Sequence, residues 1–209
     1  MESIDVIFYI NLSHRTDRKD HFLSEIKKLC LDETKIVRID ATHHTVGCIG
    51  CTKSHITAME TFQTNPEWKT CIIFEDDFTF HSDNVEENNQ RIRTAITAFP
   101  EWDVISMAYN HTDNFRYSHT SEPSIKKIIT HQTASAYCVT KKFVPTIHTI
   151  FIEAYEGLCK EGRKVHHFCH DIYWNRIQAH SNWYCVFPAL GYQYANHSDI
   201  ENKHTEYKC

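Results

Sequence analysis

Short apolar runs alternate with segments of helical spacing through the first half of the chain, and this alternation is the feature that most constrains its fold. The run DVIFYINL at 5–12 is rich in Ile, Val and aromatic residues, which is typical of a buried strand. The next segment, 17–30, places Phe22, Ile26 and Leu29 at helical spacing. Further strands are predicted at 35–39 and 68–77, with a further helix at 47–62. The alternation favours an α/β sheet, mixed but mostly parallel, with helices on both faces.

The second half contains similar elements around one segment that lacks any pattern. Asp83 and Glu86 form a capping-box pattern, which predicts the start of a helix that ends near Ala98. Residues 110–123 are polar and without periodicity, and we expect a mobile loop there. Strands are predicted at 102–109, 124–130, 133–140 and within 182–195, and helices at 141–158 and 170–179. No repeat or Gly/Ser linker divides the chain, so a single domain over 1–209 is expected.

Composition and charge limit the classes of function. The formal net charge of −5 argues against a non-specific nucleic-acid binder, which needs a basic face. No apolar run approaches the roughly 18 residues that span a bilayer, and the first residues do not resemble a signal peptide. The nine cysteines are odd in number and irregularly spaced, which predicts reduced thiols rather than a disulfide framework. We therefore expect a cytoplasmic protein without a transmembrane segment, located in the host cytoplasm if it is virus-encoded.

Three consecutive carboxylates, Glu75, Asp76 and Asp77, end the predicted strand at 68–77. Carboxylates packed this closely repel one another, and burial makes the repulsion more costly. A divalent cation bound among the three carboxylates removes that cost. Their position also fits a binding site, because α/β sheets bind ligands beyond the carboxyl ends of the strands. Glu75 and Asp77 share a face of an extended segment, although any two of the three could converge where the chain turns. Oxygen ligands suit Mg²⁺ or Mn²⁺, and the alternative is a solvated acidic turn that binds no ion.

The chain contains three motifs in order: VIFYINLSHRTDRKDHF, GCIGCTKSH and IIFEDDFTF. Their order and spacing resemble glycosyltransferase family 25, which includes lipooligosaccharide galactosyltransferases and collagen galactosyltransferases. That family has an Ile-Asn-Leu strand followed by two arginines, a Gly-x-x-Gly-Cys-x-x-Ser-His segment and a Glu-Asp-Asp strand end. The matching residues are Ile10, Asn11, Leu12, Arg15, Arg18, Gly47, Gly50, Cys51, Ser54, His55, Glu75, Asp76 and Asp77. Looser matches at 133–144, 170–174 and 197–200 extend the resemblance over nearly the whole chain.

The resemblance implies a GT-A-like nucleotide-binding fold and an inverting transfer. The donor would be a UDP-sugar such as UDP-galactose, and the acceptor a hydroxyl of a glycan or a protein. A surface-glycan precursor, as in lipopolysaccharide biosynthesis, is one expected acceptor. Mn²⁺, or Mg²⁺ in its place, would sit at the acidic motif, because a cation stabilises the charge that builds on a leaving diphosphate.

The resemblance also implies roles for individual residues. The metal ligands would be Glu75, Asp77 and His197, and the nucleotide-sugar contacts would be Asn11, Leu12, Arg15, Arg18, Ser54 and Asp76. Inverting transfer needs a general base, for which Asp171 is the first candidate and Asp113 the second. Asp171 would open a helix whose N-terminus keeps a carboxylate ionised, and its alternative role is an N-cap. For His55 we expect a structural role on the buried face of its helix.

Three other functions compete with this interpretation. Cys48 and Cys51 form a Cys-x-x-Cys pair, and HHFCH adds thiol and imidazole donors that suit structural zinc. Those additional donors are His166, His167, Cys169 and His170. A second Cys-x-x-Cys pair is absent, which weakens the zinc hypothesis. A non-catalytic relative that binds a partner is expected to have lost part of the acidic motif. In this chain, Glu75, Asp76 and Asp77 are all present. A hydrolase that uses paired carboxylates would differ from a transferase in its product.

Overall fold

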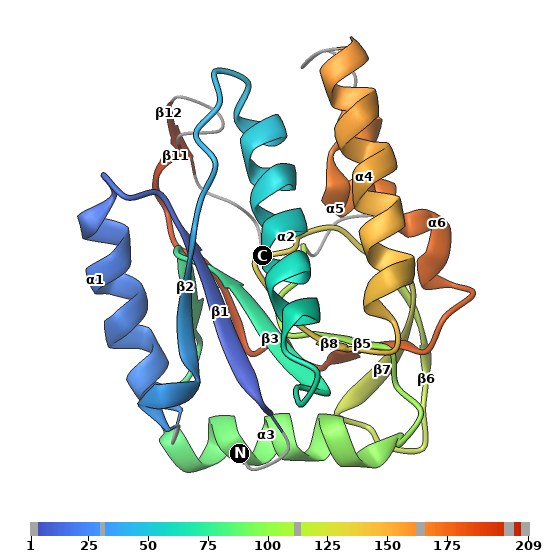
Figure 1. Ribbon diagram of the computed structural model, residues 1–209. Helices are drawn as coiled ribbons and strands as arrows, with labels where there is room; N and C mark the ends of the chain where they lie inside the picture. Colours follow the sequence, from blue (N-terminus) through green and yellow to red (C-terminus); the bar gives the residue numbers. More distant parts are fainter. Residues whose placement is uncertain (1–3, 30–31, 111–113, 162–165, 199–202, 206–209) are drawn as a thin grey trace.

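The computed structural model describes residues 4–29, 32–110, 114–161, 166–198 and 203–205 (Figure 1). Its centre is an eight-stranded sheet with the strand order β2-β1-β3-β8-β5-β9-β7-β6. The strands are β1 (Val6–Asn11), β2 (Ile36–Asp40), β3 (Thr70–Glu75), β5 (Val104–Ser106), β6 (Arg116–His119), β7 (Ile125–Thr130), β8 (Ala136–Thr140) and β9 (Trp183–Val186). Two short antiparallel ladders accompany the sheet: β4 (Phe78–Phe80) with β10 (Gly191–Gln193), and β11 (Asn196–Ser198) with β12 (Lys203–Thr205).

The helices follow the sequence pattern closely. They are α1 (Thr16–Glu25), α2 (Gly47–Thr64), α3 (Val85–Ala98), α4 (Val144–Glu161), α5 (His170–Tyr173) and α6 (Asn175–Gln178). Three short 3-10 helices are η1 (Ile26–Lys28), η2 (Glu33–Lys35) and η3 (His166–Phe168).

Six of the eight strands of the large sheet run in the same direction. Strand β1 is parallel to β2 and β3, and β5 is parallel to β9. Strand β8 runs antiparallel to both β3 and β5, and β7 runs antiparallel to both β9 and β6. Only β8 and β7 are therefore reversed within this sheet, and the predicted mixed, mostly parallel α/β sheet is confirmed.

Both faces of the sheet are buried, as a continuous apolar strand requires. In β1, Phe8 and Ile10 join the apolar core on one face, and Ile7 and Tyr9 join the core on the other. Helices α2 and α4 pack against each other over the first face, while α1 and α3 contribute side chains to the second core (Figure 1). Successive side chains of a strand point to opposite faces, so a strand with an apolar core on both faces needs an unbroken apolar run.

The start of α2 lies unusually close to the segment that follows β2, and a glycine permits this approach. A Cβ atom on Gly50 would lie 2.3 Å from the carbonyl oxygen of Thr42. Ser54, one turn later on α2, accepts a hydrogen bond from Thr42 N over 2.8 Å and donates to Gly50 O over 2.7 Å. The glycine and the serine thus fix the segment after β2 against α2, at the edge where β1, β2 and β3 end.

Four sequence predictions about elements need correction. The N-cap of α3 is Asn84, whose side chain accepts from Glu87 N over 3.0 Å, so the capping box based on Asp83 is wrong. The segment expected to be a mobile loop contains β6, which pairs with β7. The helix expected at 170–179 is divided into α5 and α6, and the strand expected at 102–109 is shortened to β5. Local patterns do not contain the strand pairing that forms β6 and sets the length of β5.

The part of the chain that the structure describes has no helix with an apolar stretch of the length that crossing a bilayer requires.

Candidate active site

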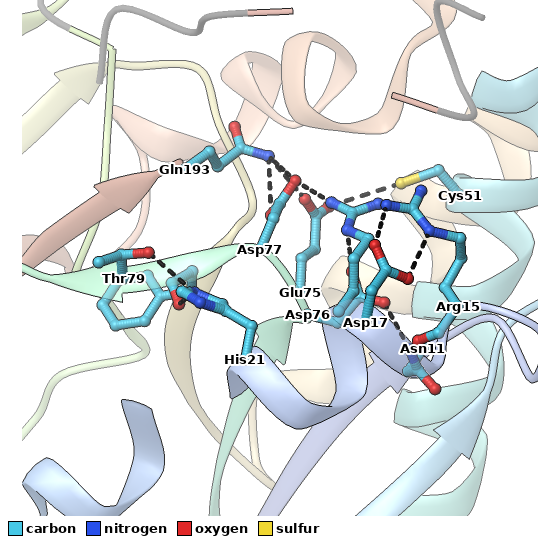
Figure 2. Close-up of polar contacts among 12 residues, drawn as sticks. Asn11, Arg15, Asp17, His21, Cys51, Glu75, Asp76, Asp77, Thr79 and Gln193 are labelled. Carbon is cyan, nitrogen blue, oxygen red and sulfur yellow. Dashed lines mark hydrogen bonds and ion pairs between the residues drawn. The ribbon is translucent and has the colours of Figure 1, made fainter. Parts of the chain in front are cut away.

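Strand β3 ends at Glu75, and the chain then turns through Asp76 and Asp77 into β4. Figure 2 shows Glu75 and Asp77 converging on the amide group of Gln193, at the end of β10. The Nε2 nitrogen of Gln193 lies 3.0 Å from Oε2 of Glu75 and 3.3 Å from Oδ1 of Asp77. Asp76 and Asp77 form the turn between β3 and β4, so this turn, and not the alternation of an extended strand, brings the carboxylate of Asp77 beside that of Glu75.

Asp76 is held by a different set of partners. Asn11, the last residue of β1, donates from Nδ2 to Oδ2 of Asp76 over 2.7 Å. Arg18 in α1 forms ion pairs with both aspartates, and its Nε lies 3.0 Å from Oδ1 of Asp76. The side chain of Arg18 is only 12% exposed, and those of Asp76 and Asp77 are 7% and 5% exposed. A buried ion pair of this kind is strongly destabilised when one partner is removed, because the other charge stays buried.

The acidic motif carries more negative charge than its contacts neutralise. Burial is the largest cause that raises the pKa of Asp76, to about 7, and Arg18 offsets only part of it. Burial also raises the pKa values of Asp77 and Glu75, again against the opposing effect of Arg18. Three carboxylates facing one guanidinium make a site that gains from a further positive charge.

The acidic motif forms one wall of an open pocket at the carboxyl ends of β1, β2 and β3. The pocket is lined by Ile10, Leu12, Arg18, Ala41, Thr42, His43, His44, Gly47, Cys51, Ser54, Glu75, Asp76, Asp77 and Gln193. Leu12, Arg18, Ser54 and Asp76 were predicted to contact a nucleotide sugar, and all four line this pocket. The hydroxyl of Ser54 is engaged by Thr42 and Gly50, so its hydrogen bonds serve the backbone of this wall.

The other two predicted nucleotide-sugar contacts, Asn11 and Arg15, are not among the residues that line the pocket. Asn11 is 1% exposed and orients Asp76 from beneath, while its Oδ1 accepts from Nε of Arg38 over 3.1 Å. Arg15 forms an ion pair with Asp17, with Nη2 at 2.9 Å from Oδ2, and it is not among the residues that line the pocket.

A second pocket adjoins the first one. It is lined by Cys48, Cys51, Glu75, Thr133, Ala134, Cys169, His170, Asp171, Ile172 and Gln193. Cys51, Glu75 and Gln193 line both pockets, so these three side chains form a shared wall. The structure therefore brings the predicted base, Asp171, to the other side of the wall that carries the acidic motif.

The surroundings of Asp171 differ from the sequence prediction. The N-cap of α5 is Cys169, and Asp171 lies in the first turn, so the N-cap alternative for Asp171 is wrong. Oδ2 of Asp171 accepts a hydrogen bond from the backbone N of Thr133 over 3.3 Å, and Thr133 adopts a positive φ of 87°. Burial raises the pKa of Asp171, so the expected effect of a helix N-terminus is outweighed by desolvation.

Two further predicted residues cannot be placed in the site. Asp113 lies outside the described residues. His197 belongs to β11, where its backbone pairs with that of His204, and its side chain is likewise outside the description.

Several residues of the site were not predicted from the sequence. Gln193 ends a three-residue strand without periodicity, and it reaches Glu75 across 118 positions. His55 is fully buried, as expected for its helical face, but its Nε2 also lies 3.1 Å from Oε1 of Glu75. Only the spacing of Cys51 and His55, one helical turn apart, could have indicated that both side chains point toward the same place.

Comparisons with known structures and families agree with this architecture. The crystal structure of A197 from STIV superimposes with a TM-score of 0.53 at 11% identity, covering 99% of this chain and 97% of that one. A glycosyltransferase involved in the glycosylation of the major capsid of PBCV-1 gives a TM-score of 0.51 at 8% identity, covering 94% of this chain and 96% of that one. At such identities the likeness shows the fold, which is a GT-A-like nucleotide-binding α/β fold.

A model of one protein family narrows the class further. Residues 35–154 match the model described as glycosyltransferase family 25 (LPS biosynthesis protein). This match covers more than half of the 209 residues, and the chain therefore belongs to glycosyltransferase family 25. A comparison with curated proteins found no match.

Proposed function

We propose that this protein is an inverting, Mn²⁺-dependent hexosyltransferase that moves a sugar from a UDP-sugar to a hydroxyl of a glycan or protein acceptor. The observation that carries the proposal is the shared wall of Cys51, Glu75 and Gln193 between two pockets. The first pocket contains the acidic motif, and the second contains Asp171. A donor in the first and an acceptor in the second would meet at this wall, as transfer between two bound molecules requires.

The first pocket fits a divalent cation. Oxygens of Glu75 and Asp77 surround a single nitrogen of Gln193, so two hard ligands already face one point. The excess of carboxylates over guanidinium supplies the negative charge that such an ion neutralises. Bound there with Glu75 and Asp77, Mn²⁺ would stabilise the negative charge that builds on the departing nucleoside diphosphate.

The residues of the first pocket also suit the nucleotide. Arg18 offers a guanidinium at the pocket surface, a group that recognises phosphate oxygens through paired hydrogen bonds. The backbone around Leu12 and the segment 41–44 form the remaining wall, at the strand ends where α/β sheets bind nucleotides. We take UDP-galactose as the first donor to test, because the family resemblance points to galactosyl transfer.

Asp171 is proposed as the general base. It lines the second pocket beside Glu75, and burial raises its pKa toward the range in which a carboxylate accepts a proton efficiently. The carboxylate would take the proton of the acceptor hydroxyl as that oxygen attacks the sugar from the face opposite the diphosphate. The whole unit is proposed to act as a single domain over residues 1–209.

The test is donor turnover with the products identified. Purified protein is incubated with UDP- and GDP-sugars and a panel of glycan and peptide acceptors, in Mn²⁺ or in EDTA. We expect release of UDP from one donor and a glycosylated acceptor, both lost in EDTA and in Asp77→Asn. Asp171→Asn should keep UDP binding and lose transfer, whereas Asp40→Asn, on an aspartate 72% exposed, should retain both.

Two results would contradict the proposal. Free sugar as the product in the presence of every acceptor would indicate a hydrolase. Failure of the protein to bind either UDP or Mn²⁺ would indicate a non-catalytic member of the family.

A further inference from the structure

Four potential metal ligands from three separate elements meet beside the acidic motif. They are Cys51 and His55 on α2, Glu75 at the end of β3, and His170 at the start of α5, and we refer to them as the Cys51 cluster. Their ligand atoms all lie within 4.8 Å of one another. The zinc hypothesis drawn from the sequence included Cys51 and His170, but the other two members come from outside the Cys-x-x-Cys and HHFCH segments.

The hydrogen bonds of His170 determine which of its ring nitrogens is available. The hydroxyl of Thr52 donates its only hydrogen to Cys48 O over 2.8 Å. It can therefore only accept from His170, whose Nδ1 lies 3.1 Å away and must carry the proton. The other nitrogen, Nε2, is then an acceptor with a free lone pair.

That lone pair has no hydrogen-bond partner among the described residues, although His170 is only 4% exposed. Buried polar atoms are nearly always paired, and an unpaired one calls for an explanation such as an ion. In metal sites a ligating histidine characteristically donates its second ring N–H to an oxygen acceptor, as His170 does to Thr52.

Of the other three ligand atoms, the carboxylate oxygen is already in contact with both the nitrogen and the sulfur. Oε1 of Glu75 lies 3.1 Å from Nε2 of His55 and 3.5 Å from Sγ of Cys51. The edges of a tetrahedron of sulfur, nitrogen and oxygen around zinc are about 3.3–3.8 Å for the usual bond lengths. The separation from sulfur lies within this range, and the separation from the His55 nitrogen is about 0.2 Å below it. The second ring nitrogen of His55 is held by the hydroxyl of Tyr137 at 3.0 Å, so this ring is also fixed from behind.

We propose that Cys51, His55, Glu75 and His170 bind one Zn²⁺ ion. A thiolate and a carboxylate balance its two positive charges, so the occupied cluster would be neutral within a largely buried environment. Each imidazole has one ring nitrogen held by a hydroxyl group, His55 by Tyr137 and His170 by Thr52, which leaves the other ring nitrogen to face the cluster. Sulfur and imidazole donors favour zinc over Mn²⁺, which the oxygen ligands of the acidic motif favour.

Zinc in this position would connect α2, β3 and α5 directly. His170 precedes Asp171, so the ion would fix the start of the helix that carries the proposed base; this consequence rests on the proposed function, whereas zinc binding itself does not. The two oxygens of Glu75 face different partners, Oε1 the Cys51 cluster and Oε2 Gln193. Glu75 is therefore the link between the zinc ligands and the acidic motif.

The test measures metal binding without any assay of transfer. The full-length protein is stripped with a chelator under reducing conditions, and Zn²⁺ is titrated in competition with a chromophoric chelator. We expect one equivalent of tightly bound Zn²⁺, and on replacement with Co²⁺ a thiolate-to-metal charge-transfer band with the visible absorption of a tetrahedral ion. Cys51→Ser should remove the charge-transfer band, and both Cys51→Ser and His170→Gln should weaken Zn²⁺ binding by more than about 100-fold.

Matched controls separate this site from the other thiols. Cys48→Ser changes a neighbouring cysteine of the same pocket, and Cys159→Ser changes an exposed one, and both should keep the stoichiometry and the cobalt spectrum. Thr52→Val keeps all four ligands but removes the acceptor for His170 Nδ1, and should weaken zinc binding by about 10–100-fold. This variant keeps the measurement informative if Cys51→Ser fails to fold.

Two outcomes would overturn the proposal. One is a wild-type protein that binds less than one equivalent of Zn²⁺, and the other is a cobalt charge-transfer band that survives in Cys51→Ser. Asp77→Asn distinguishes the two hypotheses, since it should retain zinc while losing the proposed transfer. Wild-type protein that binds zinc but transfers no sugar would contradict the proposed function alone, and wild-type protein that transfers sugar without binding zinc would contradict the zinc proposal alone.

Discussion

Gln193 donates a hydrogen bond from Nε2 to Oε2 of Glu75 over 3.0 Å, and this bond connects a side chain of β10 to the acidic motif. The same nitrogen lies 3.3 Å from Asp77. One amide therefore occupies the position between two carboxylates where a cation is proposed to bind.

Gln193→Ala is expected to destabilise the metal-free protein by about 2 kcal/mol, because hydrogen bonds to charged groups contribute more than neutral ones. With saturating Mn²⁺ the loss should be smaller, since the ion interacts with the same oxygens. Urea unfolding in EDTA and in Mn²⁺ measures both values. Gln90→Ala, on an exposed glutamine of α3, serves as the control. An equal loss in both conditions would argue against cation binding between Glu75 and Asp77.

Arg18→Met should cost about 3 kcal/mol of unfolding free energy, because it leaves Asp76 and Asp77 buried without their cation. Adding Asp76→Asn to this variant should recover part of the loss, which a double-mutant cycle quantifies. The control is Arg15→Met, three residues earlier, whose partner Asp17 is 63% exposed; it should lose no more than about 1 kcal/mol. If Arg18→Met and Arg15→Met lowered the unfolding free energy equally, the ion pairs of Arg18 would contribute no more than an exposed pair does.

Stability is expected to fall in acid because of His131, which is fully buried. Its Nδ1 donates to Gln132 O over 2.9 Å, and its Nε2 accepts from the hydroxyl of Ser106 over 2.7 Å. Burial lowers its pKa from 6.5 to about 4, so the unfolded chain takes up a proton that the folded state excludes. This contribution is complete above pH 6.5 and is lost as the pH falls toward 4, by about 3 kcal/mol in total.

Unfolding free energies measured across that pH range test this prediction. His131→Gln should reduce the slope, whatever its effect on the absolute stability, because one of the groups that exclude a proton is gone; His55 and His170, whose pKa values burial lowers to about 3, keep their part of it. His180→Gln, at an exposed position, should leave the slope unchanged. A slope that is the same in His131→Gln and in the wild type would assign the acid sensitivity to other groups.

Gly50→Ala should destabilise the protein by about 1–3 kcal/mol, the cost of overpacking. The added Cβ would meet the backbone oxygen of Thr42 at 2.3 Å, and a backbone atom cannot rotate away as a side chain can. Lys53→Ala, on the same helix with its side chain 37% exposed, should change stability by less than about 0.5 kcal/mol. Thermal unfolding compares the two variants, and an unperturbed Gly50→Ala would show that α2 can move away from the segment after β2.

The sequence predicted those parts of the fold that local pattern determines. Continuous apolar runs identified β1 and β3, and helical spacing identified α2 with His55 on its buried side. The acidic motif could be located because it follows such a run, and parallel strands end at a common edge. These predictions needed only one segment at a time.

The remaining features depend on contacts between distant segments. Nothing near Gln193 indicates that β10 pairs with β4, and this pairing is what places its amide beside Glu75. The segment expected to be a loop forms β6 because β7 offers it a partner. The sequence identified His170 as a possible metal donor. It could not show that Glu75 and His55 lie beside His170, because only the packing of α5 in the folded chain brings these side chains together.

Strand β8 runs opposite to β3, and this direction decides whether residues before or after a strand line the second pocket. Because β8 is antiparallel to β3, the residues that precede it lie at the edge where β3 ends, and Glu75 N donates to Ser135 O over 2.9 Å. Parts of the first pocket come from residues that end or follow β1, β2 and β3. In the second pocket, Thr133 and Ala134 instead come from the segment that precedes β8. Changes in length before β8 can therefore reshape the Asp171 pocket while the ends of β1, β2 and β3 keep their positions. If the two pockets bind acceptor and nucleotide as proposed, such changes give members of this fold a route to new acceptors that leaves nucleotide recognition untouched.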